Sequence, residues 1–188
     1  FTTATVPVFL TRAINWLRRR GELVADDRNG VIFVGAGPVA LRMASLLADD
    51  TTVTLIDTNS EHVRTAERLG LKVIKGNAID DDVLGEADAA GARCLIAVTT
   101  NAEVNLLAAR LARRQFGVPS VSVAMPEEAS KSMLRMLEEV DGIQLFGRSV
   151  DRTAWDLAAG GGSVVELRYD VADPEEVFTT TPRPNGRP

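Results

Sequence analysis

The residues best suited to ligand chemistry form a glycine-rich turn, GAGPVA, at positions 35–40. A short apolar run precedes this turn and helix-forming residues follow it, so the pattern predicts a strand, a tight turn and a helix. Gly35 lets the chain turn, and Gly37 lets a phosphate approach the backbone without meeting a Cβ. Pro38 fits the first helical turn because its missing N–H would have had no helical partner. The unpaired N–H groups and the positive end of the helix dipole predict a phosphate site here.

An acidic residue follows about twenty residues later, as a dinucleotide-binding turn requires. Asp57 ends the apolar run VTLID, which is expected to form the second strand. A carboxylate at this place accepts hydrogen bonds from both hydroxyls of an unmodified ribose and repels a 2′-phosphate, so it favours adenosine-type ligands over NADP. The alternative is that Gly35 and Gly37 form an ordinary strand-to-helix turn and that Asp57 caps the next helix.

From Val31 onward, strand-like and helix-like segments alternate, which is typical of a parallel sheet covered on both faces. We expect an α/β fold with six βα units, a doubly wound Rossmann sheet whose ligand lies beyond the carboxyl ends of the strands. The expected strands cover residues 31–35, 52–57, 71–75, 93–98, 120–124 and 143–146, and the expected helices cover residues 38–48, 60–69, 80–88, 101–116, 126–139 and 149–159.

Two further turns lie at the same edge of the expected sheet. Gly76, Asn77 and Ala78 stand where an adenine would lie beyond the ribose. The turn of residues 99–101 opens a helix, so its side chains could cap that helix or offer hydroxyl and amide groups to the far end of the ligand. Helix capping is the alternative for each polar side chain of both turns.

Composition narrows the classes of partner and site. The chain has 188 residues and a net charge of −5, which argues against nucleic acid as the main partner. One cysteine excludes an intrachain disulfide framework and one histidine makes a zinc site improbable, so a reducing, cytoplasmic setting is the simplest interpretation. We expect Cys94 to be a small buried residue and His62 to lie on a solvated helix face. The acids of residues 80–82 are expected to start a helix and to hold no metal.

The two ends of the chain differ from the middle. In residues 1–20 an apolar stretch is followed by Trp16 and the arginines at positions 18–20. This segment resembles either the cytoplasmic end of a transmembrane helix or an amphipathic packing helix, and length does not decide between them. We therefore divide the chain into a juxtamembrane helix and linker at 1–30, a nucleotide-binding domain at 31–160, and an extra strand with a flexible tail at 161–188.

Four segments resemble the nucleotide-binding lobe of the RCK/KTN domains, which regulate potassium channels, potassium uptake systems and cation:proton antiporters. These segments are GAGPVA at 35–40, LIDTNSE at 55–61, VIKGNAIDDDVL at 73–84 and AVTTNAEVNLLAARLAR at 97–113. The resemblance implies that NAD(H) or an adenine nucleotide (AMP, ADP or ATP) binds here. The implied binding residues are Gly35, Gly37, Pro38, Val39, Asp57, Thr58, Gly76, Asn77, Ala78, Thr99, Thr100 and Asn101.

The resemblance also implies a function and partners. The chain would be the cytoplasmic regulatory domain of a K⁺ or Na⁺/H⁺ channel or antiporter, bound to that protein's membrane domain and assembled as a homodimer or larger homo-oligomer. It departs from the family where Met125 and Pro126 replace a basic residue, and where the usual second lobe is absent or short. The alternative is a small NAD-dependent dehydrogenase of the siroheme or precorrin type, whose opening motif is similar to VGAGPVALR at 34–42. We expect no catalytic residue, because His62 and Cys94 are poorly placed for one.

Overall fold

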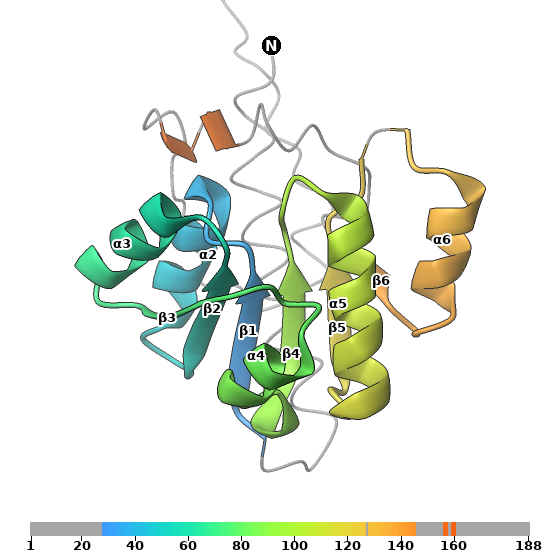
Figure 1. Ribbon diagram of the computed structural model, residues 1–188, viewed down its shortest axis with the longest axis horizontal. Helices are drawn as coiled ribbons and strands as arrows, with labels where there is room; N and C mark the ends of the chain where they lie inside the picture. The colour runs from blue at the N-terminus through green and yellow to red at the C-terminus, as the bar shows by residue number, and fades with distance from the viewer. Residues whose placement is uncertain (1–27, 127, 146–155, 158, 161–188) are drawn as a thin grey trace, which may run out of the picture.

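The computed structural model describes residues 28–126, 128–145, 156–157 and 159–160 (Figure 1). The segment expected at the membrane junction, most of the helix expected at 149–159, and the expected last strand and tail lie outside these residues. None of the helices that the structure describes combines the length and apolar character needed to cross a membrane.

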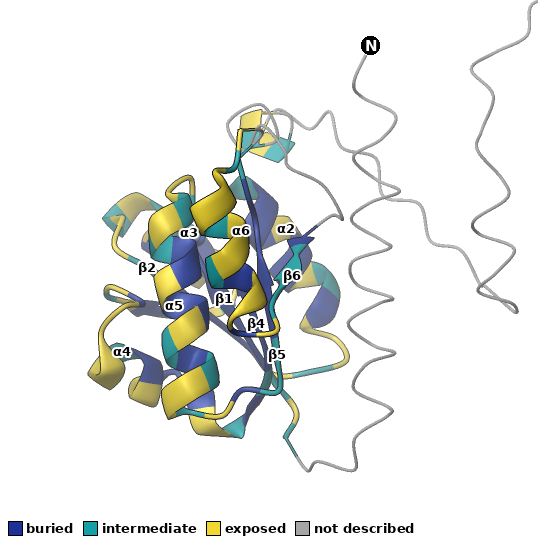
Figure 2. Cartoon of the chain, turned by 90° about the vertical axis from the view of Figure 1, so that its right-hand side faces the viewer, coloured by how far each residue is buried: buried dark blue, intermediate teal, exposed yellow. Residues whose placement is uncertain are grey.

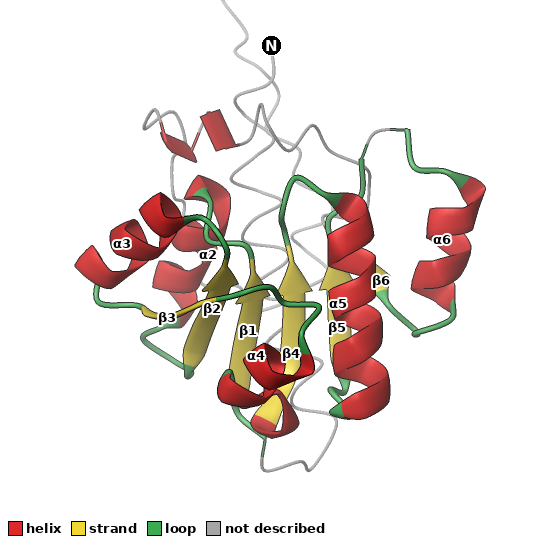
Figure 3. Cartoon of the chain, in the orientation of Figure 1, coloured by secondary structure: helices red, strands yellow, loops and turns green. Residues whose placement is uncertain are grey.

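Six parallel strands form one sheet in the order β3-β2-β1-β4-β5-β6, which confirms the doubly wound Rossmann sheet (Figure 3). The order reverses between β1 and β4, and the arrowheads of these strands point to one common edge. Ligands of such sheets bind at this reversal, beyond the carboxyl ends of the strands. The strands are β1 (Gly30–Val34), β2 (Val53–Asp57), β3 (Lys72–Lys75), β4 (Ala92–Ala97), β5 (Ser120–Val123) and β6 (Ile143–Gln144).

Helices cover both faces of the sheet, and their apolar sides close two core clusters. Alternate residues of β1 enter alternate clusters: Phe33 packs with α2, and Ile32 packs in the cluster built by α4, α5 and α6. Because both faces are covered, the four central strands are buried almost throughout, whereas the edge strands β3 and β6 are only partly buried (Figure 2). The helices are α2 (Pro38–Leu47), α3 (Ser60–Arg68), α4 (Asp81–Glu86), η1 (Ala89–Gly91), α5 (Ala102–Gln115) and α6 (Lys131–Glu138).

Two helix boundaries differ from the expected ones by more than one residue. The helix expected at 126–139 begins only at Lys131, because Ser130 caps it by accepting a hydrogen bond from Met133 N at 3.2 Å. The helix expected at 80–88 ends at Glu86, and Asp88 then takes a left-handed conformation with φ of 59° before the short helix η1. A left-handed residue cannot continue a right-handed helix, so the chain leaves the helical path there.

Candidate nucleotide-binding site

The turns that follow β1, β2, β3 and β4 lie at one edge of the sheet. The strand registers align these ends, since Val34 is level with both Ile56 and Ala97. The predicted site residues therefore lie along one edge of the sheet, although the sequence spreads them over residues 35–101. Because backbone N–H groups at strand ends have no ladder partner beyond the sheet, such an edge can present donors to a ligand.

Gly35 makes the first turn possible for two reasons. Its φ is +101°, which residues with a Cβ rarely adopt, and a Cβ added there would lie 3.2 Å from both Thr99 N and Thr99 Cγ2. The turn after β1 is thus packed directly against the turn after β4. Gly35 N donates to Ile56 O at 2.8 Å, which ties the first turn to β2 as well.

The amino end of α2 has the features of an anion site. Gly37 is the N-cap and brings no capping side chain, Pro38 occupies the first helical turn, and that turn contains no acidic residue. Val39 therefore supplies the first helical N–H, because Pro38 has none. Ala40 is fully buried, which allows the close contact between helix and sheet that this position requires.

Asp57 joins the second turn to the first. Its Oδ2 accepts a hydrogen bond from Ala36 N at 2.6 Å, and its Oδ1 accepts one from Asn59 N at 2.8 Å. The alternative in which Asp57 caps the next helix is wrong, since Asn59 is the N-cap of α3 and accepts from Glu61 N. The carboxylate is 12% exposed, so a ligand over the Gly35 turn would lie beside a partly buried negative charge.

His62 lies on α3 with 38% of its side chain exposed, which agrees with the expected solvated helix face. Its contact with Asp57 was not expected: His62 Nδ1 lies 2.9 Å from Asp57 Oδ2. A carboxylate can only accept, so Nδ1 carries the hydrogen and donates it. The position five residues after Asp57 places His62 on the first turn of α3, facing back towards the strand end. The sequence spacing alone did not reveal this, because it gives no direction for the side chain of Asp57.

The third turn carries a structural glycine and an exposed amide. A Cβ on Gly76 would lie 2.7 Å from Val83 Cγ2, so this glycine lets α4 pack close to the chain. Gly76 N donates to Asp57 O at 3.1 Å, which links the third turn to the second. Asn77 is exposed and its Oδ1 accepts from Ile79 N at 3.3 Å, whereas Ala78 is 3% exposed and its methyl group belongs to the core.

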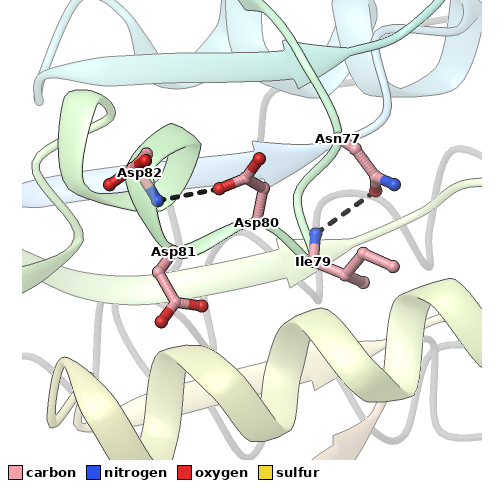
Figure 4. Close-up of a pocket in the computed structure, with 5 residues that line it drawn as sticks. All are labelled: Asn77, Ile79, Asp80, Asp81 and Asp82. Atoms are coloured by element: carbon pink, nitrogen blue, oxygen red, sulfur yellow. Dashed lines mark hydrogen bonds between the residues drawn. The ribbon is translucent and has the colours of Figure 1, made fainter.

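A shallow, open pocket adjoins this turn (Figure 4). Its walls are Asn77, Ile79 and the three acids of residues 80–82. Asp80 accepts a hydrogen bond from Asp82 N at 3.0 Å and so caps α4, which confirms that these acids start a helix. The pocket joins an apolar side chain to hydrogen-bond acceptors, a combination that suits the flat face and amino group of a purine.

In the fourth turn, hydrogen bonds within the protein engage two of the three predicted side chains, and one of these two, Asn101, is a helix cap. Asn101 Oδ1 accepts from Glu103 N and Val104 N at the start of α5. The hydroxyl of Thr99 accepts from Asn101 N and donates within the protein, to Asn105 Oδ1 at 2.6 Å or to Asn101 O at 3.0 Å. Thr100 is exposed, as Thr58 is in the second turn.

Asn105 was not predicted as a site residue, yet it holds this edge together. It is completely buried, accepts from Thr99 N at 3.0 Å, and donates to Thr99 O and Ala124 O. It thereby joins the turn after β4 to the end of β5. The sequence did carry a signal for this role, because Asn105 is a polar residue on the apolar side of its helix, one turn after the cap Asn101.

Cys94 lies in β4 and is 3% exposed, which confirms it as a buried small residue. Burial raises the pKa of its thiol from 9.0 to about 12, so the thiol stays protonated at neutral pH.

Comparison with known proteins agrees with the fold and with the motifs. The family model of the TrkA-N domain matches residues 31–143, more than half of the chain. The Trk system potassium uptake protein TrkA of Haemophilus influenzae is 34% identical over 92 residues, which are 48% of this chain and 20% of that protein. A TrkA homolog of Methanothermobacter thermautotrophicus is 38% identical over 110 residues, 55% of this chain and 50% of that protein.

A more distant relative is the glutathione-regulated potassium-efflux system protein KefC of Salmonella arizonae, 28% identical over 122 residues, which are 60% of this chain and 19% of KefC. The chain thus spans between about a fifth and a half of these relatives. Among solved structures, the TrkA-N domain of the inner membrane protein ybaL from Escherichia coli has a TM-score of 0.56 at 20% identity, covering 71% of this chain and 98% of that one.

The GsuK channel bound to NAD has a TM-score of 0.50 at 18% identity, covering 70% of this chain and 24% of that one. At identities of 20% and 18%, these two structures show that the fold is shared. The motifs after β1, β2, β3 and β4 and the match over residues 31–143 lead to one conclusion: this chain belongs to the TrkA-N domain family.

Proposed function

We propose that this chain is a nucleotide-sensing regulatory domain that gates a K⁺ channel or a K⁺ or Na⁺/H⁺ antiporter. NAD(H) or an adenine nucleotide is the proposed ligand. One observation carries the proposal: the four turns at the carboxyl edge of the sheet are tied together around the start of α2. Asp57 receives Ala36 N at 2.6 Å and Gly76 N on its backbone oxygen, and Gly35 packs on Thr99.

The fit between these residues and the ligand supports the proposal. The start of α2 can hold a phosphate through Val39 N–H and the helix dipole, and Asp57 can accept from ribose hydroxyls. Asn77 and the pocket beside it can hold adenine. The names of the relatives, a potassium uptake protein and a potassium-efflux protein, and of a channel of the same fold bound to NAD, support regulation of ion transport.

Regulation requires that the nucleotide favour one of two arrangements of the domain, because equal affinity for both would shift nothing. The proposed partner is the membrane domain of a channel or antiporter, the proposed assembly is a homodimer, and the proposed location is the cytoplasmic face of the cell membrane. The alternative of a small dehydrogenase predicts consumption of the nicotinamide cofactor, whereas a sensor binds without turnover.

The test measures binding of NAD, NADH, AMP, ADP and ATP by calorimetry, with NADP as the comparison. Asp57→Asn is the sharpest variant, since it keeps an acceptor for Ala36 N while removing the charge. We expect the wild-type chain to prefer NAD over NADP, and the variant to lose about tenfold of that preference as the repulsion of the 2′-phosphate disappears.

Asp49→Asn is the matched control, because this exposed acid follows the far end of α2, about 15 Å from the glycine turn. It should leave both affinities unchanged. Oxidation of NADH in the presence of a porphyrin precursor would favour the dehydrogenase, and absence of binding by every nucleotide would contradict the proposal.

A further inference from the structure

A segment distant in sequence lies against the first turn of α2. Val39 N donates to Asp156 Oδ1 at 3.2 Å, across 117 positions of the chain. A Cβ on Gly160 would lie 3.7 Å from Pro38 Cγ, and Ala159 packs against the core cluster that contains Val39 and Ala40. Figure 1 shows the two short pieces around these residues next to the amino end of α2. One hydrogen bond, one packing contact and the close approach of Gly160 to Pro38 therefore place these residues at the glycine turn.

Asp156 satisfies the same backbone group that a phosphate would need. A carboxylate and a phosphate both present anionic oxygens to the N–H groups and positive dipole end of a helix. Gly37 has no side chain and Pro38 has no N–H, so Val39 N is the first helical donor at this end. A negative oxygen that already accepts from Val39 N occupies the position of a phosphate oxygen and repels a second anion.

We propose that Asp156 is an intramolecular competitor of the nucleotide phosphate, and that it sets the affinity of the site for phosphorylated ligands. The inference rests on the nucleotide site proposed above. Because the carboxylate and the phosphate exclude each other at Val39 N, binding of a nucleotide displaces Asp156, and holding Asp156 in place weakens binding by the same factor. Adenosine, which has no phosphate, does not compete with Asp156.

The experiment uses the 188-residue chain and two ligands, ADP and adenosine, with affinities measured by calorimetry. Asp156→Ala removes the competing carboxylate, and Asp49→Ala removes an equal charge at the far end of α2. We expect ADP to bind roughly fivefold more tightly to Asp156→Ala than to the wild-type chain, because ADP no longer has to displace a carboxylate from Val39 N. Adenosine affinity should be the same in all three proteins, and Asp49→Ala should match the wild type.

A second measurement works without ligand. Hydrogen exchange at the Val39 amide, followed by NMR, should be faster in Asp156→Ala than in the wild-type chain, because the amide has lost its acceptor. Unchanged exchange, or an ADP affinity equal in the two proteins, would overturn the inference and leave the nucleotide function standing. If neither protein binds ADP or NAD, the proposed function itself fails, and competition at Val39 fails with it.

Discussion

Three acidic or amide side chains have different roles at one edge of the sheet. Asp57 accepts from two backbone N–H groups and from His62, Asn105 connects two strand ends from a fully buried position, and Asp156 lies at the start of α2. A buried polar group is costly unless its hydrogen bonds are made, so Asn105 fixes the geometry of the turn beside it. Asn105 thus ties this edge together from inside, whereas Asp156 contacts the start of α2 from a distant part of the chain.

Cys94 allows a prediction at the same scale. Burial raises its pKa from 9.0 to about 12, so the folded chain keeps a proton that the unfolded chain releases above pH 9. The stability that the protonated thiol contributes is complete below pH 9 and is lost as the pH rises towards 12. We expect iodoacetamide at pH 9 to label the unfolded chain and to spare the folded one.

The measurement is intact mass with and without urea, and it is unambiguous because the chain has one cysteine. Labelling of the folded chain at the rate seen in urea would show that the thiol of Cys94 is accessible.

At the scale of elements, the glycines differ in whether the backbone or the packing requires the absence of a side chain. Gly35 combines φ of +101° with a near neighbour in Thr99, whereas Gly70 has φ of +73° and open space around its missing Cβ. Gly85 lies inside α4, also in open space. The three positions separate backbone strain, side-chain clash and helix propensity from one another.

Substituting alanine at each of these glycines should give three different changes in the free energy of unfolding. We expect Gly70→Ala to cost about 1 kcal/mol from the left-handed backbone, and Gly35→Ala to cost at least about 2 kcal/mol, because the new methyl group also meets Thr99. Gly85→Ala should stabilise by about 0.5–1 kcal/mol through helix propensity.

Urea unfolding measures all three changes in the free energy of unfolding. A cost at Gly35 no larger than at Gly70 would contradict the contact between the turns after β1 and β4.

At the scale of the molecule, the sheet reversal between β1 and β4 gathers the four turns, and helices close both faces. The described surface also carries exposed leucines. Leu157 is 78% exposed and lies one residue from Asp156, while Leu69 is 56% exposed after α3. We expect the side chain of Leu157 to lie in the contact between the two copies of the proposed homodimer.

The proposed homodimer leads to a prediction. We expect sedimentation to show a dimer, and Leu157→Ser to raise its dissociation constant at least about tenfold, since each copy would lose much of a buried leucine. Leu69→Ser, at the second exposed leucine, should leave the dimer unchanged. A monomer at all concentrations, with and without nucleotide, would contradict the dimer.

The sequence by itself determined the succession of strands, turns and helices along the chain. It showed the glycine turn after β1, the acid at the end of β2, and the alternation that builds a parallel sheet. These features follow from local chemistry, because backbone freedom at Gly35, the missing N–H of Pro38 and the period of apolar residues act within a few positions. Asn101 as a helix cap was predictable for the same reason.

Only the tertiary structure decided which groups meet across the chain. The contact of His62 with Asp57 depends on how α3 leaves the strand end, and the bonds of Asn105 to Thr99 and Ala124 depend on the packing of α5 between two strand ends. The contact between Asp156 and Val39 joins residues 117 positions apart. The periodicity of apolar residues cannot predict that these two residues meet. The free energy that holds them together comes from the packing of whole elements and not from neighbouring residues in the sequence.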